Sequence, residues 1–222
     1  CAKLMGKPID QLRIITCHLG NGSSITAVDH GRSIDTTMGM SPTGGLMMGT
    51  RSGDLDPSVV TYIAEKTGEH GNEFLRVFNE RSGLLGVSGI SSDNRDIERA
   101  ASLGNEQAQL AHDMLCYQIK KYIGGYIAAM GGLDALVFTG GIGENSDEVR
   151  GDVCANMEYL GIKIDEEKNK TKGDIVDLTA EGATVKTFII CTNEELMIAR
   201  DTKALVEVDA MMHAKKEVAP EE

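Results

Sequence analysis

A glycine-rich segment near residue 140 has the composition of a loop that binds phosphate. It reads Gly140-Gly-Ile-Gly-Glu-Asn145 and follows a short apolar run, residues 135–139. Glycines between a buried strand and a helix let the backbone approach a ligand and place a helix N-terminus beside it. The dinucleotide fingerprint G-x-G-x-x-G fits only in part, because residue 146 is Ser. A tight turn, with Asn145 as helix N-cap and Glu148 as its reciprocal partner, explains the segment equally well.

A second candidate is His18-Leu-Gly-Asn-Gly22, at the tip of a predicted hairpin. Backbone N–H groups exposed at such a turn can form a concavity that binds an anion. A plain Asn-Gly turn needs no ligand, and His18 would then be a hydrogen-bonded polar residue at a strand end. Taken alone, this motif does not decide between the two interpretations.

Two charged side chains stand where they could act on a phosphoryl group. Arg51 lies in Gly49-Thr-Arg-Ser-Gly-Asp54, among small residues that leave a guanidinium free to stabilise developing charge. Glu194 follows an apolar run in Thr192-Asn-Glu-Glu195, where Thr192 and Glu195 would form a capping box. Ligands gather at the carboxyl edge of parallel strands, so Glu194 could hold Mg²⁺ there, directly or through water.

The elements that would position these residues alternate between strands and helices. Apolar runs predict strands at residues 12–17, 23–28, 34–37, 135–139 and 185–191. Capping residues and periodicity predict helices at residues 57–66, 72–80, 93–103 and 105–130, then from about 147 and from 195 to 206. Residues 38–54 form a long loop, which is typically functional or disordered. The pair Gly124-Gly125 predicts close approach of another element.

Composition bounds the class of protein. The 222 residues are 41% hydrophobic and 25% charged, which predicts one large α/β domain. No apolar run approaches the roughly 20 residues of a membrane helix, and the net charge of −12 argues against nucleic-acid binding. The start, Cys1-Ala-Lys-Leu-Met-Gly-Lys7, lacks an initiator Met and indicates a fragment.

The five cysteines are scattered and form no C-x-x-C pair, so their spacing indicates neither a zinc site nor a disulfide framework. Cys17 and Cys191 lie in apolar runs, where each would be a small buried hydrophobe. This usage indicates a reducing compartment, hence the cytoplasm.

In combination and in this order, the motifs resemble the C-terminal nucleotide-binding part of the acetate kinases, the acetokinase family. The match spans about residues 1–205 and adds Asp35-Thr-Thr-Met-Gly39, Gly83-Leu-Leu-Gly-Val-Ser-Gly89 and Ser92-Asp-Asn-Arg-Asp96. That family belongs to the actin, Hsp70 and sugar-kinase superfamily. The resemblance therefore implies an α/β, ribonuclease H-like domain over residues 1–210, with a mixed central sheet flanked by helices. Residues 211–222 would be an acidic, frayed tail.

The resemblance also implies a function: reversible transfer of phosphate between ATP and acetate, giving ADP and acetyl phosphate, by a cytoplasmic homodimer that uses Mg²⁺. Arg51 is similar to the family's transition-state arginine, and Glu194 to its magnesium carboxylate. The residues that would bind the nucleotide are His18, Leu19, Gly20, Asn21, Gly22, Asp93, Asn94, Arg95, Gly141, Ile142, Gly143, Glu144 and Asn145.

The family's N-terminal domain carries a magnesium-site Asn, a substrate-binding Arg, a catalytic Asp and a second transition-state His, and none of these has a counterpart here. The chain alone is therefore predicted to bind nucleotide with little or no kinase turnover. Propionate or butyrate kinase is the near alternative. A non-catalytic nucleotide-binding or dimerisation module is an alternative of another class, and an NAD-binding domain is disfavoured by Ser146.

Overall fold

A computed structural model describes residues 1–68 and 70–217 of the 222-residue chain. It divides into two compact units, Cys1–Cys191 and Thr192–Glu222. All the described strands lie in the first unit, and the described part of the second consists mainly of helix α10 (Glu194–Glu217). Residues 218–222 of the predicted frayed tail lie outside the described residues, and the domain boundary at residue 210 stays a prediction.

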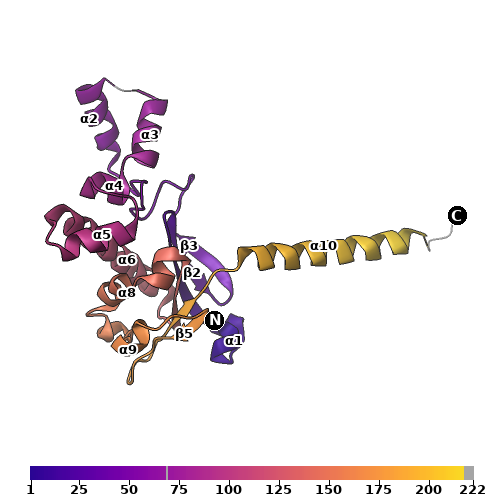
Figure 1. Cartoon of the computed structure of the whole chain (residues 1–222). Coiled ribbons are helices and arrows are strands. Elements are labelled where there is room, and N and C mark those ends of the chain that lie inside the picture. Colours follow the sequence, from indigo (N-terminus) through magenta and orange to yellow (C-terminus); the bar gives the residue numbers. More distant parts are fainter. Residues whose placement is uncertain (69, 218–222) are drawn as a thin grey trace. The chain divides into compact units, whose positions relative to one another are not determined.

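A mixed six-stranded sheet forms the centre of the first unit, with strand order β3-β2-β1-β4-β6-β5 (Figure 1). Its strands are β1 (Arg13–Leu19), β2 (Ser23–Asp29), β3 (Arg32–Thr36), β4 (Ala135–Thr139), β5 (Ile175–Asp177) and β6 (Lys186–Ile190). β1, β4 and β6 run parallel, whereas β2, β3 and β5 pair antiparallel to their neighbours. The predicted hairpin and mixed sheet are confirmed. A doubly wound parallel sheet, which an NAD-binding domain requires, is absent from the described part.

The helices of the first unit are α1 (Ala2–Met5), α2 (Pro57–Thr67), α3 (Asn72–Glu80), α4 (Gly83–Ser88), α5 (Asn94–Ser102), α6 (Glu106–Met130), α7 (Gly140–Asn145), α8 (Asp147–Cys154) and α9 (Glu166–Asn169), with short 3₁₀ turns at Ile9–Gln11 and Glu158–Leu160. Helices α6 and α7 contact the sheet, whereas α2 and α3 lie away from it (Figure 1). α2 starts and stops as predicted, because the Asp56 carboxylate accepts the Ser58 N–H and Gly68 adopts the left-handed cap. Among the described helices, none has the length and apolar character that crossing a bilayer requires.

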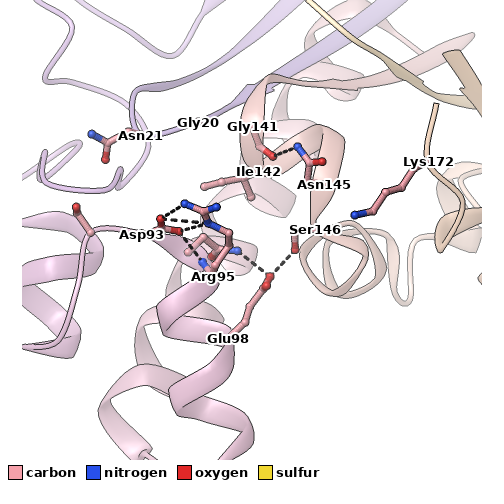
Figure 2. Close-up of a pocket in the computed structure, with 12 residues that line it drawn as sticks. Gly20, Asn21, Asp93, Arg95, Glu98, Gly141, Ile142, Asn145, Ser146 and Lys172 are labelled. Atoms are coloured by element: carbon pink, nitrogen blue, oxygen red, sulfur yellow. Dashed lines mark hydrogen bonds and ion pairs between the residues drawn. The ribbon is translucent and has the colours of Figure 1, made fainter. Parts of the chain in front are cut away.

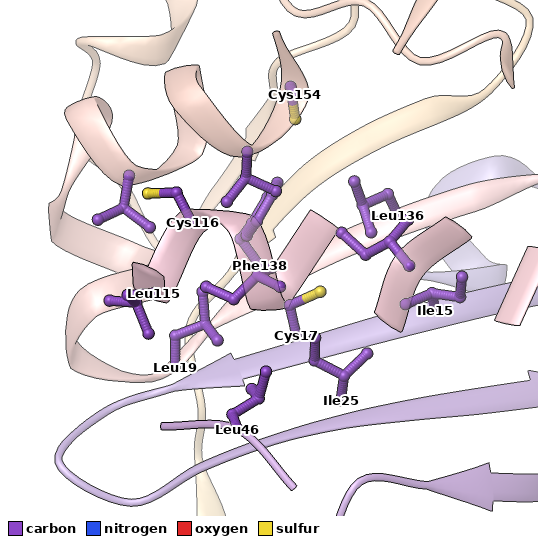
Figure 3. Packing of buried hydrophobic residues seen from close by; sticks show 14 of the residues in the cluster. Ile15, Cys17, Leu19, Ile25, Leu46, Leu115, Cys116, Leu136, Phe138 and Cys154 are labelled. Atoms are coloured by element: carbon purple, nitrogen blue, oxygen red, sulfur yellow. The ribbon is translucent and has the colours of Figure 1, made fainter. Parts of the chain in front are cut away.

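The two faces of the sheet bury separate clusters. Side chains alternate along a strand, so Ile15, Cys17 and Leu19 of β1 pack beneath α6, together with Phe138 of β4 (Figure 3). Ile14 packs on the opposite face, near α1. Since α5 and α8 in turn pack on α6, the end of β1 is held against a rigid helical layer.

Four predictions about the helices are wrong. The segment Gly140–Asn145 is the short helix α7, because Gly140 (φ 77°) turns the chain directly out of β4. Ser146, and not Asn145, caps α8, and its Oγ accepts the Val149 N–H at 3.0 Å. A Cβ added at Gly124 or Gly125 would meet nothing within 4 Å, so none of the described elements approaches α6 closely there.

The fourth error concerns α10. This helix begins at Glu194, and the Asn193 Oδ1 accepts the Leu196 N–H at 3.1 Å. The predicted capping box of Thr192 and Glu195 stays a prediction. The helix continues past the predicted end at Val206. Cys191 differs from its prediction too, since it is only partly buried, whereas Cys17 is fully buried as expected.

Candidate functional site

A cavity of about 740 Å³ opens at the carboxyl end of β1 and β4 (Figure 2). Its walls come from the turn after β1, from the start of α5, from α7 with Ser146, and from Lys172 in the segment before β5. The carboxyl end of parallel strands is where α/β proteins bind ligands, and the volume lies in the range of sites for small molecules.

Eight of the thirteen residues predicted to bind nucleotide line this cavity, although they come from three distant parts of the sequence. They are Gly20, Asn21, Asp93, Asn94, Arg95, Gly141, Ile142 and Asn145. The sequence motifs therefore converge on one concave surface. Their contact with a ligand stays a prediction.

The other five residues do not line the cavity. Leu19 is fully buried in the core, and Gly143 lies against the backbone of Phe138. The Glu144 carboxylate accepts the Gly140 N–H at 2.9 Å, which closes the first turn of α7. Strand alternation puts His18 on the sheet face opposite to Leu19 and α6. Any role of these residues toward a ligand stays a prediction.

Gly22, the fifth, lies against the guanidinium of Arg51. A Cβ at position 22 would be 3.0 Å from the Nη1 atom of that arginine. The same Nη1 donates weakly to the Pro42 carbonyl at 3.4 Å. Arg51 is thus beside the turn that follows β1, with its side chain only partly buried.

The loop of residues 38–54 is ordered by hydrogen bonds, and Leu46, Met47 and Met48 anchor it in the protein interior. The Gly49 N–H donates to the Asn21 carbonyl, and the Met48 N–H to the Arg51 carbonyl, each at 3.0 Å. The length of this loop predicted that it is either functional or disordered. These contacts show that it is ordered. Arg51 and the turn at Asn21 are fixed to each other through the backbone.

Sequence reasoning missed four of the cavity residues: Ser92, Glu98, Ser146 and Lys172. Glu98 is central among them, because its Oε1 accepts hydrogen bonds from the Asn94 amide (2.7 Å) and from the Ser146 hydroxyl. The spacing of Asn94 and Glu98, one turn apart on α5, could have revealed this pair. Lys172 carried no signal, because only the fold brings its segment to the cavity.

Similar proteins of known family help to interpret this cavity. The sequence matches the acetokinase family over residues 1–200. The chain belongs to this family. Relatives include the acetate kinases of Moorella thermoacetica, 57% identical over 206 residues, and of Desulforamulus reducens, 58% identical over 205 residues. These matches cover 93% and 92% of this chain and 52% of each relative, so the chain spans about half the length of the curated relatives it matches.

Solved structures of the same family agree with the fold. A crystal structure of Porphyromonas gingivalis acetate kinase matches with a TM-score of 0.90 and 47% identity, over 92% of this chain and 52% of that one. Acetate kinase from Entamoeba histolytica matches with a TM-score of 0.86 and 36% identity, over 91% and 54%. A propionate kinase from Francisella tularensis matches with a TM-score of 0.83 and 41% identity, over 89% and 50%. The predicted family and fold class are confirmed.

The rim of this acetokinase cavity carries a tight ion pair. The Arg95 Nε donates to the Asp93 Oδ1 at 3.0 Å, and the same carboxylate accepts the backbone N–H of Arg95 at the start of α5. These hydrogen bonds lower the pKa of Asp93 to about 2. Asp93 therefore keeps its negative charge, and the two side chains hold each other in the orientation seen in Figure 2.

We expect Arg95→Gln to raise the pKa of Asp93 above its value of about 2, because the side-chain hydrogen bonds are lost while the backbone bond remains. A carboxyl group whose pKa is lower in the folded state stabilises the fold above its unfolded pKa, and that contribution disappears as the pH falls through the folded pKa. In the variant this contribution should be smaller, and its loss should be complete at a higher pH. Carboxyl ¹³C NMR titration measures the midpoint. Arg99→Gln, which removes a partner of Asp96 instead, is the control, and an unchanged Asp93 midpoint in Arg95→Gln would contradict the assignment.

Proposed function

We propose that this chain supplies the nucleotide-binding part of an acetate kinase, which transfers phosphate reversibly between ATP and acetate to give ADP and acetyl phosphate. One observation carries the proposal. The sequence motifs that line the 740 Å³ cavity are the same motifs in which the chain resembles acetate kinases. Curated acetate kinases at 51–58% identity support the same substrates.

In this proposal the cavity holds ATP or ADP. Asp93, Asn94 and Arg95 border the adenosine, and the Gly141–Asn145 helix forms the other side of that pocket. The phosphates lie toward the turn at Gly20 and Asn21, in reach of Arg51. Because the whole chain carries a net charge of −12, a polyanionic ligand must be held by local hydrogen-bond donors and by a metal ion.

Mg²⁺ is the proposed metal. It prefers carboxylate and phosphate oxygens and water, and Glu194 offers an exposed carboxylate in the first turn of α10. Its donor chemistry therefore fits the ion. When bound with ATP, Mg²⁺ would neutralise charge on the transferring phosphoryl group.

Arg51 is proposed to stabilise the charge that develops on the equatorial phosphoryl oxygens. Its planar, permanently charged guanidinium suits this task. Phosphoryl transfer depends mostly on positioning and charge neutralisation, and the backbone bonds of residues 48–51 supply the positioning. We further propose a cytoplasmic homodimer. The five free cysteines support a reducing compartment.

A chimaera tests the proposed activity: this chain replaces the matching half of the M. thermoacetica acetate kinase, to which it is 57% identical. We expect the chimaera to form acetyl phosphate from ATP and acetate, and the 222-residue chain alone to show little turnover. A folded chimaera that binds ATP without forming acetyl phosphate would contradict the activity. Propionate is the second candidate acceptor, because a propionate kinase shares the fold at 41% identity, and the ratio of kcat/KM for acetate and propionate decides between them.

We expect Gly49→Ala to weaken nucleotide binding by about tenfold or more, because the added methyl group displaces walls of the cavity from the positions that contact the ligand. An added Cβ would lie 1.7 Å from the Asn21 Oδ1 and 2.9 Å from the Ser92 carbonyl oxygen, so two walls of the cavity must move. Gly39→Ala is the matched control in the same loop, because a Cβ there meets nothing within 4 Å. Calorimetric titration with ATP measures the effect, and equal affinity in both variants would argue against this cavity as the binding site.

A further inference from the structure

A second cavity, of about 310 Å³, lies next to the first and has a different chemistry. Its lining includes four carboxylate residues, Glu98, Asp147, Glu148 and Asp152, together with the buried side chain of His112. Glu98 is common to both cavities. The proposed phosphoryl transfer uses none of the groups between α6 and α8, and their arrangement therefore calls for another explanation.

Three side chains with different ligand atoms converge at this point. The His112 Nε2 lies 2.7 Å from the Asp152 Oδ2 and 3.6 Å from the Cys116 Sγ. All three ligand atoms lie within 4.8 Å of one another. Only small movements separate this arrangement from the spacing of donors around a bound metal ion.

The two helices present these donors by regular spacing. His112 and Cys116 are one turn apart on α6, so both face α8, and both are buried, with 4% and 6% of their surface exposed. Asp152 comes from α8, and Glu148, one turn earlier on that helix, lines the same cavity. The sequence search for C-x-x-C pairs could not detect this set, because its ligands come from two separate helices.

One nitrogen of the His112 ring faces the cluster and the other does not. Its Nδ1 is buried without any partner in the described structure, and buried polar atoms are nearly always paired. The Nε2, which faces Cys116 and Asp152, is therefore the ring's only engaged nitrogen. A simple helix-to-helix hydrogen bond would need the imidazole and the carboxylate but not the thiol beside them.

We propose that His112, Cys116 and Asp152 bind one Zn²⁺ ion, with Glu148 or a water molecule from the cavity as the fourth ligand. Imidazole, thiolate and carboxylate are the protein ligands of Zn²⁺, which prefers four of them in a tetrahedron. A set that includes a thiolate disfavours Mg²⁺ and Ca²⁺. On binding, Zn²⁺ displaces the proton of the Cys116 thiol to solvent. It also takes the place of the proton between the His112 Nε2 and the Asp152 carboxylate, and that proton moves to the His112 Nδ1. The ion would fasten α8 to α6 beside the nucleotide cavity.

Titration of the metal-free 222-residue chain with Co²⁺ tests this site, because tetrahedral Co²⁺ bound to a thiolate gives visible d–d bands and an ultraviolet charge-transfer band. We expect one Co²⁺ per chain with both signals, displacement by Zn²⁺, and no displacement by excess Mg²⁺. Cys116→Ser should lose the charge-transfer band, and Asp152→Asn, which changes a mainly exposed side chain, should weaken binding by about tenfold or more. Cys191→Ser, at a cysteine outside the cluster, should keep the full signal.

Absence of a charge-transfer band in the folded wild-type chain would overturn the proposal. So would a band that persists in Cys116→Ser or disappears in Cys191→Ser. Circular dichroism shows whether each variant is folded. If Cys116→Ser does not fold, the titrations of the wild-type chain and of Asp152→Asn still decide whether the site binds the metal. A magnesium carboxylate at Glu194 gives no thiolate band, so the outcome is independent of the proposed kinase activity.

Discussion

Arg51→Ala, in the chimaera with the matching half of an acetate kinase, is expected to lower kcat by about 10²–10³ while the affinity for ATP is maintained. The guanidinium lies against Gly22 at the edge of the cavity but is not among the residues that line it. It should therefore contribute little to ground-state nucleotide binding. Its effect should appear when negative charge develops on the transferring phosphoryl group.

The design of this experiment rests on two further variants. Arg51→Lys keeps the positive charge but loses the planar fork, and should recover only part of the rate. Arg76→Ala is the matched control, because that arginine is exposed on α3 and forms an ion pair with Glu80. Equal losses in kcat and in ATP affinity for Arg51→Ala would rule out a transition-state role, and unchanged kcat would favour a non-catalytic module.

Gly83→Ala is expected to lower the free energy of unfolding by about 3 kcal/mol or more, from backbone strain and overpacking combined. Gly83 has φ 63°, a conformation that alanine adopts only with strain. An added Cβ would also lie 2.1 Å from the Met48 carbonyl oxygen and 2.8 Å from the Arg51 carbonyl oxygen. Since both are backbone atoms, the loop that carries Arg51 must shift as a whole.

Gly68→Ala separates the two contributions to this loss. Gly68 has a similar φ of 72° at the end of α2, but a Cβ there meets nothing within 4 Å. Only the conformational strain remains, and we expect a loss of about 1 kcal/mol. Urea unfolding followed by circular dichroism measures both variants. Equal losses would show that close approach of the Arg51 loop to Gly83 does not contribute.

Local signals in the sequence predicted most helices well. Asp56, Pro57 and Gly68 define both ends of α2 through bonds within that segment, and Asn105 caps α6 in the same way, its Oδ1 accepting the Ala108 N–H. Such bonds depend on neighbours in the chain, so they can be predicted without the fold. At α8 two adjacent residues, Asn145 and Ser146, are both good N-caps, and only the path of the backbone selects Ser146.

Contacts between distant segments account for what the sequence could not predict. Neighbouring residues of the motif at residues 18–22 have different surroundings. Leu19 is part of the core, Gly20 lines the cavity, and His18 faces the other side of the sheet. Lys172 reaches the cavity only because its segment returns to the sheet as β5. The pair Gly124-Gly125 inside α6 predicted close packing against another element. In the structure, a Cβ added at either glycine meets nothing within 4 Å.

The central claim is that the 740 Å³ cavity binds an adenine nucleotide. Isothermal titration of the 222-residue chain with ATP–Mg²⁺, and in parallel with NAD⁺, tests it most directly. We expect saturable binding of ATP at one site, competition by ADP, and no saturable binding of NAD⁺. A folded chain that fails to bind ATP, or that binds NAD⁺ in its place, would contradict it.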